Sequence, residues 1–203
     1  MHTPSQIVFA SSNPGKITEV SHILSTFSIQ VLPQSQFYVP DAKETGLSFI
    51  ENAILKARNC CHYTKLSALA DDSGLVVPAL DGAPGIYSAR FAGEHGNHQA
   101  NIDKLLKDML QFEPQKRQAY FECVMAFMTH ENDPSPIIAQ ARLYGEITYK
   151  PSGNKGFGYD PIFRPQGYQK TLAEISPQQK NTISHRGQAL QKLRKILASD
   201  HND

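Results

Sequence analysis

The stretch that decides the fold is residues 7–24, IVFASSNPGKITEVSHIL, in a chain of 203 residues. Residues 7–10 are all apolar and predict a short buried strand, and the polar cluster of residues 11–15 after them predicts a turn. The apolar residues that follow are Ile17, Val20, Leu24 and Phe27. Their steps of three and four residues predict an amphipathic helix. A strand, a polar loop and a helix in this order are typical of an α/β fold.

Further along the chain the same kind of pattern returns. Residues 29–32 predict a second strand, and Ser48 with Glu51 forms a capping box that opens a helix. The apolar face expected for that helix consists of Leu47, Ile50, Ile54, Ala57 and Cys61. Two apolar runs, 68–70 and 75–77, predict one buried strand region that Asp71–Gly74 interrupts.

The C-terminal half predicts helices around a β-hairpin. Residues 101–111 and 187–197 have helical spacing, and the β-rich runs 118–129 and 137–147 predict an antiparallel hairpin. We therefore predict an α/β fold with a mixed sheet. A length of 203 residues favours one domain, 1–203, rather than two.

Composition narrows the possible partners and the compartment. The net charge of +1 argues against a protein that coats nucleic acid or a membrane by bulk charge. Three cysteines give no disulfide framework, and we expect them to pack in the core or at the surface without a catalytic role. No stretch has the length of a signal peptide core or a membrane span, so we expect a soluble, cytoplasmic protein.

Two stretches suggest phosphate and metal chemistry. The loop 11–16 ends in Lys16 at the start of a helix, which could bind an anion, although it lacks the glycine and hydroxyl spacing of a Walker A motif. Asp71 and Asp72 lie between apolar runs, and because neighbouring strand residues point to opposite faces, only one of them would face a given site. Such an aspartate suits Mg²⁺; the alternative is a surface turn.

Two more stretches could recognise the rest of a nucleotide. Residues 155–163, KGFGYDPIF, offer an aromatic ring beside two glycines, but Asp160 and Pro161 break the RNA-binding pattern that the first five residues match. Residues 180–187, KNTISHRG, place two cations and a histidine just before the last helix, where they could face a bound anion or simply be solvated. Phosphate-binding cations, carboxylates for Mg²⁺ and an aromatic ring together suit nucleoside triphosphate chemistry.

In this order, the stretches resemble the inosine/xanthosine triphosphate pyrophosphatase family. The resemblance runs from residue 7 to about residue 197 and rests on long blocks: 12–16 SNPGK, 44–53 ETGLSFIENA, 70–75 ADDSGL, 82–90 GAPGIYSAR, 156–163 GFGYDPIF and 184–190 SHRGQAL. It implies a long twisted mixed sheet flanked by helices, with two lobes around a deep cleft, and a homodimer. It also implies Mg²⁺-dependent hydrolysis of ITP, dITP and XTP to the monophosphate and pyrophosphate.

The resemblance also assigns roles to individual residues. It implies that Asp72 accepts a proton from the attacking water, and that Glu44 and Asp72 hold Mg²⁺. The residues implied to contact the substrate are Ser11, Ser12, Asn13, Pro14, Gly15, Lys16, Lys56, Ser73, Phe157, Gly158, Tyr159, Asp160, Lys180, His185 and Arg186. Phe157 would stack on the purine, and His185, Arg186 or backbone N–H groups would donate to its 6-oxo group.

Two other functions remain open from the sequence. A Maf-type pyrophosphatase would act on modified pyrimidine or standard nucleotides with a similar scaffold, and a panel of substrates separates the two. A nucleotide sensor would bind without turnover, but binding alone has little need for the two hard ligands Glu44 and Asp72. No nucleic-acid polymer and no membrane is expected as a partner.

Overall fold

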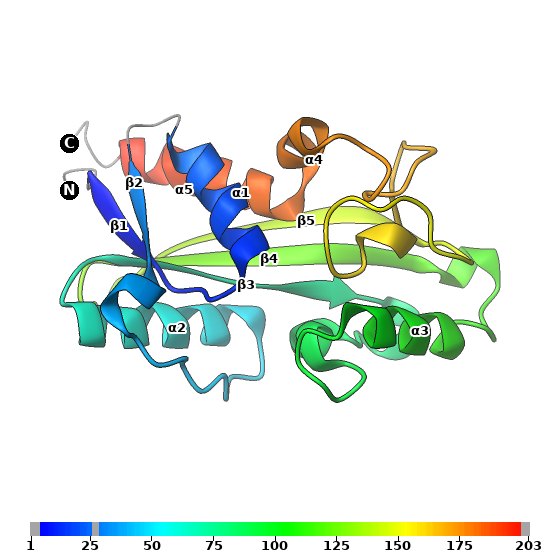
Figure 1. The fold of residues 1–203 in the computed structure, drawn as a ribbon, viewed down its shortest axis with the longest axis horizontal. Helices are drawn as coiled ribbons and strands as arrows, with labels where there is room; N and C mark the ends of the chain where they lie inside the picture. The colour runs from blue at the N-terminus through cyan, green and yellow to red at the C-terminus, as the bar shows by residue number, and fades with distance from the viewer. Residues whose placement is uncertain (1–4, 26–28, 200–203) are drawn as a thin grey trace. The chain divides into compact units, whose positions relative to one another are not determined.

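A computed structural model describes residues 5–25 and 29–199 of the chain (Figure 1). The strands are β1 Gln6–Phe9, β2 Gln30–Pro33, β3 Ala68–Val76, β4 Gln118–Met128, β5 Ile137–Ile147 and β6 Phe163–Pro165. The α-helices are α1 Pro14–Ser25, α2 Phe49–Thr64, α3 His98–Asp108, α4 Pro177–Ile183 and α5 His185–Ser199. Short 3₁₀ turns are η1 Gln34–Phe37, η2 Pro78–Leu80, η3 Gly85–Arg90, η4 Pro114–Lys116 and η5 Asp160–Ile162.

The strands form one six-stranded mixed sheet in the order β2-β1-β3-β4-β5-β6. β1 runs parallel to both β2 and β3, with Phe9 opposite Leu69 in the β1–β3 register. β5 and β6 are antiparallel. β4 and β5 are consecutive in the chain and adjacent in the sheet, as the predicted hairpin requires. The prediction of an α/β fold with a mixed sheet is confirmed.

The chain divides into two compact units. The first unit comprises 1–72, 123–141 and 186–203, and the second comprises 73–122 and 142–185. Strands β3, β4 and β5 contribute residues to both units, so neither is continuous in sequence. The prediction of a single domain with a cleft between two lobes stays a prediction. None of the helices within 5–25 and 29–199 combines the length and hydrophobicity needed to span a bilayer.

Strand alternation organises the core of the first unit. Ile7 and Phe9 of β1 pack on one face of the sheet with apolar residues of α1 and α5, whereas Val8 packs on the other face with α2. The same alternation continues in β4, where Cys123 joins the first cluster and Val124 the second. Figure 1 shows α1 and α5 on one face of these strands and α2 on the opposite face. Side chains at successive positions of β3 therefore meet different helices.

The second unit has its own core, built on α3 and the ends of the long strands. Leu105 of α3 is fully buried there, and Phe121 of β4 packs against Phe163 of β6 with ring centroids 4.7 Å apart. Arg117 is buried beside this core and donates from Nε to the carbonyl of Ile147 at 2.8 Å, which ties the start of β4 to the end of β5.

Two predictions of local structure are wrong. β3 is continuous through Asp71–Gly74, because its pairing in the sheet outweighs the turn preference of these residues. The buried face of α2 consists of Asn52, Ala53, Ala57, Cys60 and Cys61. Leu47 is 84% exposed and Ile50 is 40% exposed, because Leu47 precedes the N-cap Ser48 and the helix turns its small residues to the sheet. Phe27 lies outside the described residues.

Candidate functional site

The aspartate pair of β3 is divided between the two faces of the sheet. Asp71 follows the alternation of Leu69, which packs with α1 and α5, and Asp72 follows that of Ala70, which packs with α2. Both are buried, with 1% and 7% of their surface exposed. Burying a carboxylate costs free energy unless a cation or donor faces it, so each must be matched by the helix on its own side.

On the first face, Asp71 is held by two cations. Lys16 Nζ of α1 lies 3.1 Å from Asp71 Oδ2, and Arg186 of α5 donates to the same oxygen from Nε and Nη2 at 3.3 Å each. Arg186 also pairs with Glu19 of α1. Burial alone would raise the pKa of Asp71, but Lys16 and Arg186 outweigh it and hold this pKa well below its usual value. Asp71 is therefore a charged anchor for the two cations at neutral pH.

On the opposite face, Lys56 of α2 bridges two carboxylates. Its Nζ lies 2.7 Å from Asp72 Oδ1 and 3.0 Å from Glu44 Oε1. Burial works against the ammonium, yet the carboxylates of Asp72, Asp71 and Glu44 raise the pKa of Lys56 above its usual value. The charged form of Lys56 is thus secured.

The pKa of Asp72 moves in the other direction from that of Asp71. Burial raises the pKa of Asp72 above its usual value, and the attraction of Lys56 offsets this only in part. Lys56 is shared with Glu44, whose own negative charge raises the pKa of Asp72 further. A further positive charge near Asp72 would therefore stabilise the charged form of its carboxylate.

The free side of Asp72 fits a hard cation. Its Oδ2 is buried and has no hydrogen-bond partner among the described residues. No cluster of three or more His, Cys, Asp or Glu side chains suited to a metal occurs in the described part of the chain. Two oxygens from Glu44 and Asp72, completed by water and substrate phosphates, match the way Mg²⁺ binds in phosphoryl-transfer sites.

The loop before α1 is held by its own side chains. Asn13 Oδ1 accepts a hydrogen bond from the Lys16 N–H at 3.1 Å, and Ser11 Oγ accepts one from the Asn13 N–H at 3.2 Å. Ser12 donates to Asp41 at 2.9 Å. These bonds fix the turn that leads into α1 and place Lys16, whose side chain keeps 17% exposure, against Asp71.

In the second unit, Asp160 organises the aromatic loop, which we define as residues 155–160. One oxygen of Asp160 accepts from the Phe157 N–H at 2.9 Å and from Lys180 Nζ at 2.7 Å. Lys180 Nζ also lies 4.7 Å from the centre of the Phe157 ring. Gly156 has a φ of +76°, and a Cβ there would overlap the same Asp160 oxygen, so only glycine fits. One buried carboxylate thus sets the position of both Phe157 and Lys180.

Other predicted residues of this unit face the core. Tyr159 is 4% exposed and donates its hydroxyl to the carbonyl of Ser88 at 2.9 Å, and burial raises its pKa. His185 is buried, with its ring stacked on Phe121 at 4.8 Å. His98, which was not among the predicted site residues, is exposed at the start of α3, and its ring centroid lies 6.4 Å from that of Phe157.

The structure thus gathers the predicted residues into two groups, one in each unit. In the first unit, Lys16 and Arg186 meet at Asp71 on one face of the sheet, and Lys56 joins Glu44 to Asp72 on the other. The second unit brings together Phe157, Asp160 and Lys180. The cations of residues 180–187 face protein carboxylates. The convergence of both groups on one nucleotide stays a prediction.

Sequence reasoning gave no role to Asp71 or Glu19, the partners of Arg186. The spacing of Glu19, three residues after Lys16 on α1, was the available signal, since such residues share a helix face.

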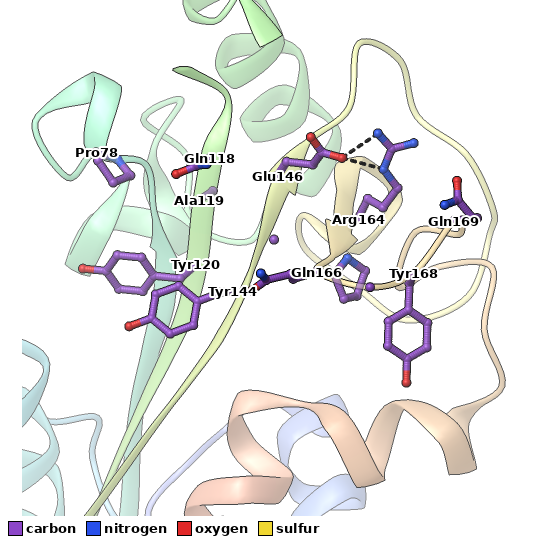
Figure 2. Close-up of a pocket in the computed structure, with 13 residues that line it drawn as sticks. Pro78, Gln118, Ala119, Tyr120, Tyr144, Glu146, Arg164, Gln166, Tyr168 and Gln169 are labelled. Atoms are coloured by element: carbon purple, nitrogen blue, oxygen red, sulfur yellow. Dashed lines mark hydrogen bonds and ion pairs between the residues drawn. The ribbon is translucent and has the colours of Figure 1, made fainter. Parts of the chain in front are cut away.

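A pocket that no motif predicted lies in the second unit, at the edge formed by β4, β5 and β6 (Figure 2). Its volume is about 600 Å³, and Tyr120, Tyr144, Tyr168, Glu146 and Arg164 are among the residues that line it. Arg164 Nε donates to Glu146 at 2.7 Å, and the rings of Tyr120 and Tyr144 are 5.5 Å apart. None of the predicted site residues lines this pocket.

Comparison with known proteins gives one consistent family. The model of the Ham1 family matches residues 7–196. A dITP/XTP pyrophosphatase of Legionella pneumophila is 52% identical over 192 residues, which cover 95% of this chain and 98% of that protein. The solved structure of a Ham1 protein from Coxiella burnetii has a TM-score of 0.89 at 47% identity, covering 96% of this chain and 98% of its own. A Staphylococcus aureus Ham1 protein has a TM-score of 0.85 at 40% identity, with coverages of 96% and 99%. These matches confirm the resemblance seen in the sequence, and the chain belongs to the Ham1 family.

Proposed function

We propose that this protein hydrolyses dITP, ITP and XTP to the nucleoside monophosphate and pyrophosphate. The observation that carries the proposal is the cluster of Lys56, Glu44 and Asp72, in which a buried Asp72 oxygen has no protein partner in the described chain. The names of relatives such as the Legionella pneumophila dITP/XTP pyrophosphatase, 52% identical over 95% of this chain, support the substrate class.

We assign Mg²⁺ to Glu44 and Asp72. Bound there, it would neutralise charge on the triphosphate and on the departing pyrophosphate. Lys16 and Lys56 would contact the phosphates from either side of β3, together with backbone N–H groups of residues 11–15. Their neighbouring carboxylates keep both lysines in place before substrate arrives.

In the chemical step, Asp72 takes a proton from the attacking water. The water oxygen bonds to the α-phosphorus while the bond from that phosphorus to the bridging oxygen breaks, and pyrophosphate leaves with the electron pair. Lys16 and Lys56 stabilise the charge that develops on the leaving group.

We assign the purine to the aromatic loop. Phe157 supplies the stacking ring, and Gly158, Tyr159 and Asp160 supply backbone groups, with Ser73 and Lys180 completing the contacts. The donors of Arg186 face Asp71 and Glu19, and His185 is buried against Phe121, so backbone N–H groups are the better donors to the 6-oxo group. Such donors would lose their partner with a 6-amino purine, which we expect to reduce kcat/KM for ATP by roughly 10⁴-fold relative to ITP.

Pyrophosphate release measured for ITP, XTP, dITP, ATP and GTP, with and without Mg²⁺, tests this function. We expect turnover only with Mg²⁺, a large preference over ATP and a smaller one over GTP. Equal kcat/KM for all five would reject the proposed selectivity. Binding without pyrophosphate release would indicate a sensor, and activity confined to ATP and GTP would indicate a Maf-type enzyme that acts on standard nucleotides.

We also propose a homodimer that works in the cytoplasm. The face of β4 and β5 that carries Tyr120 and Tyr144 supports self-association, because Tyr144 is 53% exposed and the neighbouring Arg142 is neutralised by the buried Glu122 at 2.8 Å. Three free, buried thiols are consistent with a reducing compartment. Sedimentation at several concentrations tests the dimer, and a single monomeric species would reject it.

A further inference from the structure

The segment that carries Glu44 is pinned to the first turns of α2. The N–H of Gly46 donates to Asn52 Oδ1 at 2.9 Å, and the N–H of Leu47 donates to Glu51 Oε2 at 2.9 Å. No side chain fits at position 46, because a Cβ there would lie 2.7 Å from Asn52 Oδ1 and 2.6 Å from Glu51 Cβ. The backbone two residues after Glu44 therefore cannot shift without breaking its bond to Asn52.

Asn52 is an unusual choice for the inner face of a helix. It is 1% exposed and sits among the small residues that α2 turns to the sheet. Its Nδ2 is buried and has no hydrogen-bond partner in residues 5–25 and 29–199. A buried donor without a partner lowers stability, so packing alone would favour an apolar side chain here. The hydrogen bond that the Asn52 side chain does make is the one it accepts from the Gly46 N–H.

Helix geometry connects this bond to the metal site. Asn52 and Lys56 are four residues apart and share one face of α2. Lys56 holds the carboxylate of Glu44 at 3.0 Å and that of Asp72 at 2.7 Å, while Asn52 holds the backbone beside Glu44. We infer that Asn52 is a positioning residue for the divalent metal, which acts through Gly46 to fix where the Glu44 carboxylate stands relative to Asp72. This inference rests on the proposed function.

The inference is tested by measuring the affinity of the protein for a metal ion in the absence of turnover. Mn²⁺ is titrated into the protein by electron paramagnetic resonance, in the presence of an ITP analogue with a methylene group between the α- and β-phosphates. We expect Asn52→Ala to weaken Mn²⁺ binding by about 10- to 100-fold, as outer-shell substitutions do. Gly46→Ala should give a similar loss, because its methyl group would overlap Glu51 and Asn52 and push the same segment away from α2.

A matched control is available on the same helix. The side chain of Asn59 also donates a hydrogen bond to the loop before α2, to the carbonyl of Pro40 at 2.8 Å. Pro40 lies four residues before Glu44 in the chain, whereas Gly46 lies two residues after it. Asn59→Ala should change Mn²⁺ affinity by no more than about twofold, since a surface bond remote from the site is lost. A general loosening of the loop would instead weaken binding equally in both variants, which would overturn the inference.

A double substitution identifies the route. If Asn52 acts through Glu44, adding Asn52→Ala to Glu44→Gln should cause no further loss of Mn²⁺ affinity. A full additional loss, or wild-type affinity in Asn52→Ala, would overturn the inference. If Asn52→Ala does not fold, Gly46→Ala and Asn52→Ser carry the same comparison.

The inference and the proposed function fail in different ways. The proposed function fails if the wild-type protein releases no pyrophosphate from ITP or XTP with Mg²⁺. The inference alone fails if the wild type is Mg²⁺-dependent and Asn52→Ala binds Mn²⁺ as tightly as the wild type.

Discussion

At the scale of single residues, Asp71 and Asp72 show how position in a strand separates two identical side chains. Asp71 has a lowered pKa because Lys16 and Arg186 outweigh its burial, and Asp72 has a raised pKa because burial outweighs Lys56. Folding therefore favours the charged form of Asp71 and disfavours that of Asp72. We therefore expect stability to depend on the Asp71 carboxylate and the proposed chemistry to depend on that of Asp72.

A pair of substitutions separates these roles. Asp71→Asn should lower the free energy of unfolding by about 3 kcal/mol, because it leaves Lys16 and Arg186 facing a neutral group in the interior. Asp72→Asn should change it by less than about 1 kcal/mol, since Lys56 keeps Glu44, but should lower kcat by roughly 10³-fold or more. Urea unfolding and pyrophosphate release measure the two effects.

The pH dependence gives a second check on Asp71. Because its pKa is lowered in the folded state, its contribution to stability is complete above the unfolded value of about 4 and declines as the pH falls below it. The stability gap between wild type and Asp71→Asn should therefore narrow only in acid. A gap that stays constant down to pH 2 would contradict the assignment.

The sequence predicts one half of this arrangement. Lys56 and Asp72 are charges beside apolar runs, and the alternation of side chains along a strand is enough to assign the two aspartates to opposite faces. The pairing of Asp71 with Arg186 could not be predicted, because the two lie 115 residues apart and only the tertiary fold brings them together. No local pattern encodes such a contact.

At the scale of elements, the N-cap of α2 was easier to predict than its buried face, and the helix predicted over 101–111 is α3, His98–Asp108. The Ser48 cap of α2 forms as predicted, with Ser48 Oγ accepting from the Glu51 N–H at 3.3 Å, because a capping box is a local interaction. The exposed position of Leu47 was not predictable, since it depends on how the helix meets the sheet. β3 likewise stays extended through Asp71–Gly74 because its neighbours in the sheet supply pairing that a turn would forfeit.

The β4–β5 connection depends on one carboxylate. Asp133 accepts from the Thr129 N–H, the Thr129 hydroxyl and the Ser135 N–H, each at 2.9 Å. Burial alone would raise its pKa, but these hydrogen bonds outweigh that effect and lower it. The stabilisation is therefore present above about pH 4 and is lost as the pH falls through the folded value.

Asp133→Asn should accordingly lower the free energy of unfolding by roughly 1–3 kcal/mol at pH 7, with a smaller difference below pH 4. Thermal or urea unfolding at pH 7 and pH 3 measures both. Pyrophosphate release at 25 °C should be unchanged, because Asp133 is not among the proposed site residues. An equal loss at both pH values would show that the charge of Asp133 is not what stabilises the loop.

At the scale of the whole molecule, all three thiols report on unfolding. Cys60 and Cys123 are 0% exposed and Cys61 is 1% exposed. Burial raises the pKa of Cys60 to about 12 and that of Cys61 to about 11, and it raises the pKa of Cys123 as well. In the folded state the three thiols are therefore neither ionised near neutral pH nor accessible to a reagent.

Reaction with a thiol reagent at pH 7.5 should be slow in the native protein and complete for three cysteines in urea. The native rate should follow the equilibrium population of opened molecules, so Asp71→Asn should accelerate it. A Gln115→Cys variant, which adds an exposed thiol, should react at once at one position and serves as the reference. Rapid labelling of the native wild-type protein would contradict the buried positions.

The resemblance implied two lobes, but residue patterns did not predict where the two units divide, because β3, β4 and β5 each pass from one unit to the other. The alternation of β3 has a final consequence. Since a shift of one position exchanges the two faces of a strand, deletion or insertion of a single codon before Asp71 would exchange the faces of the anchoring carboxylate and the proposed catalytic one. This part of β3 should therefore tolerate substitutions around the doublet far better than a change in the length of the strand.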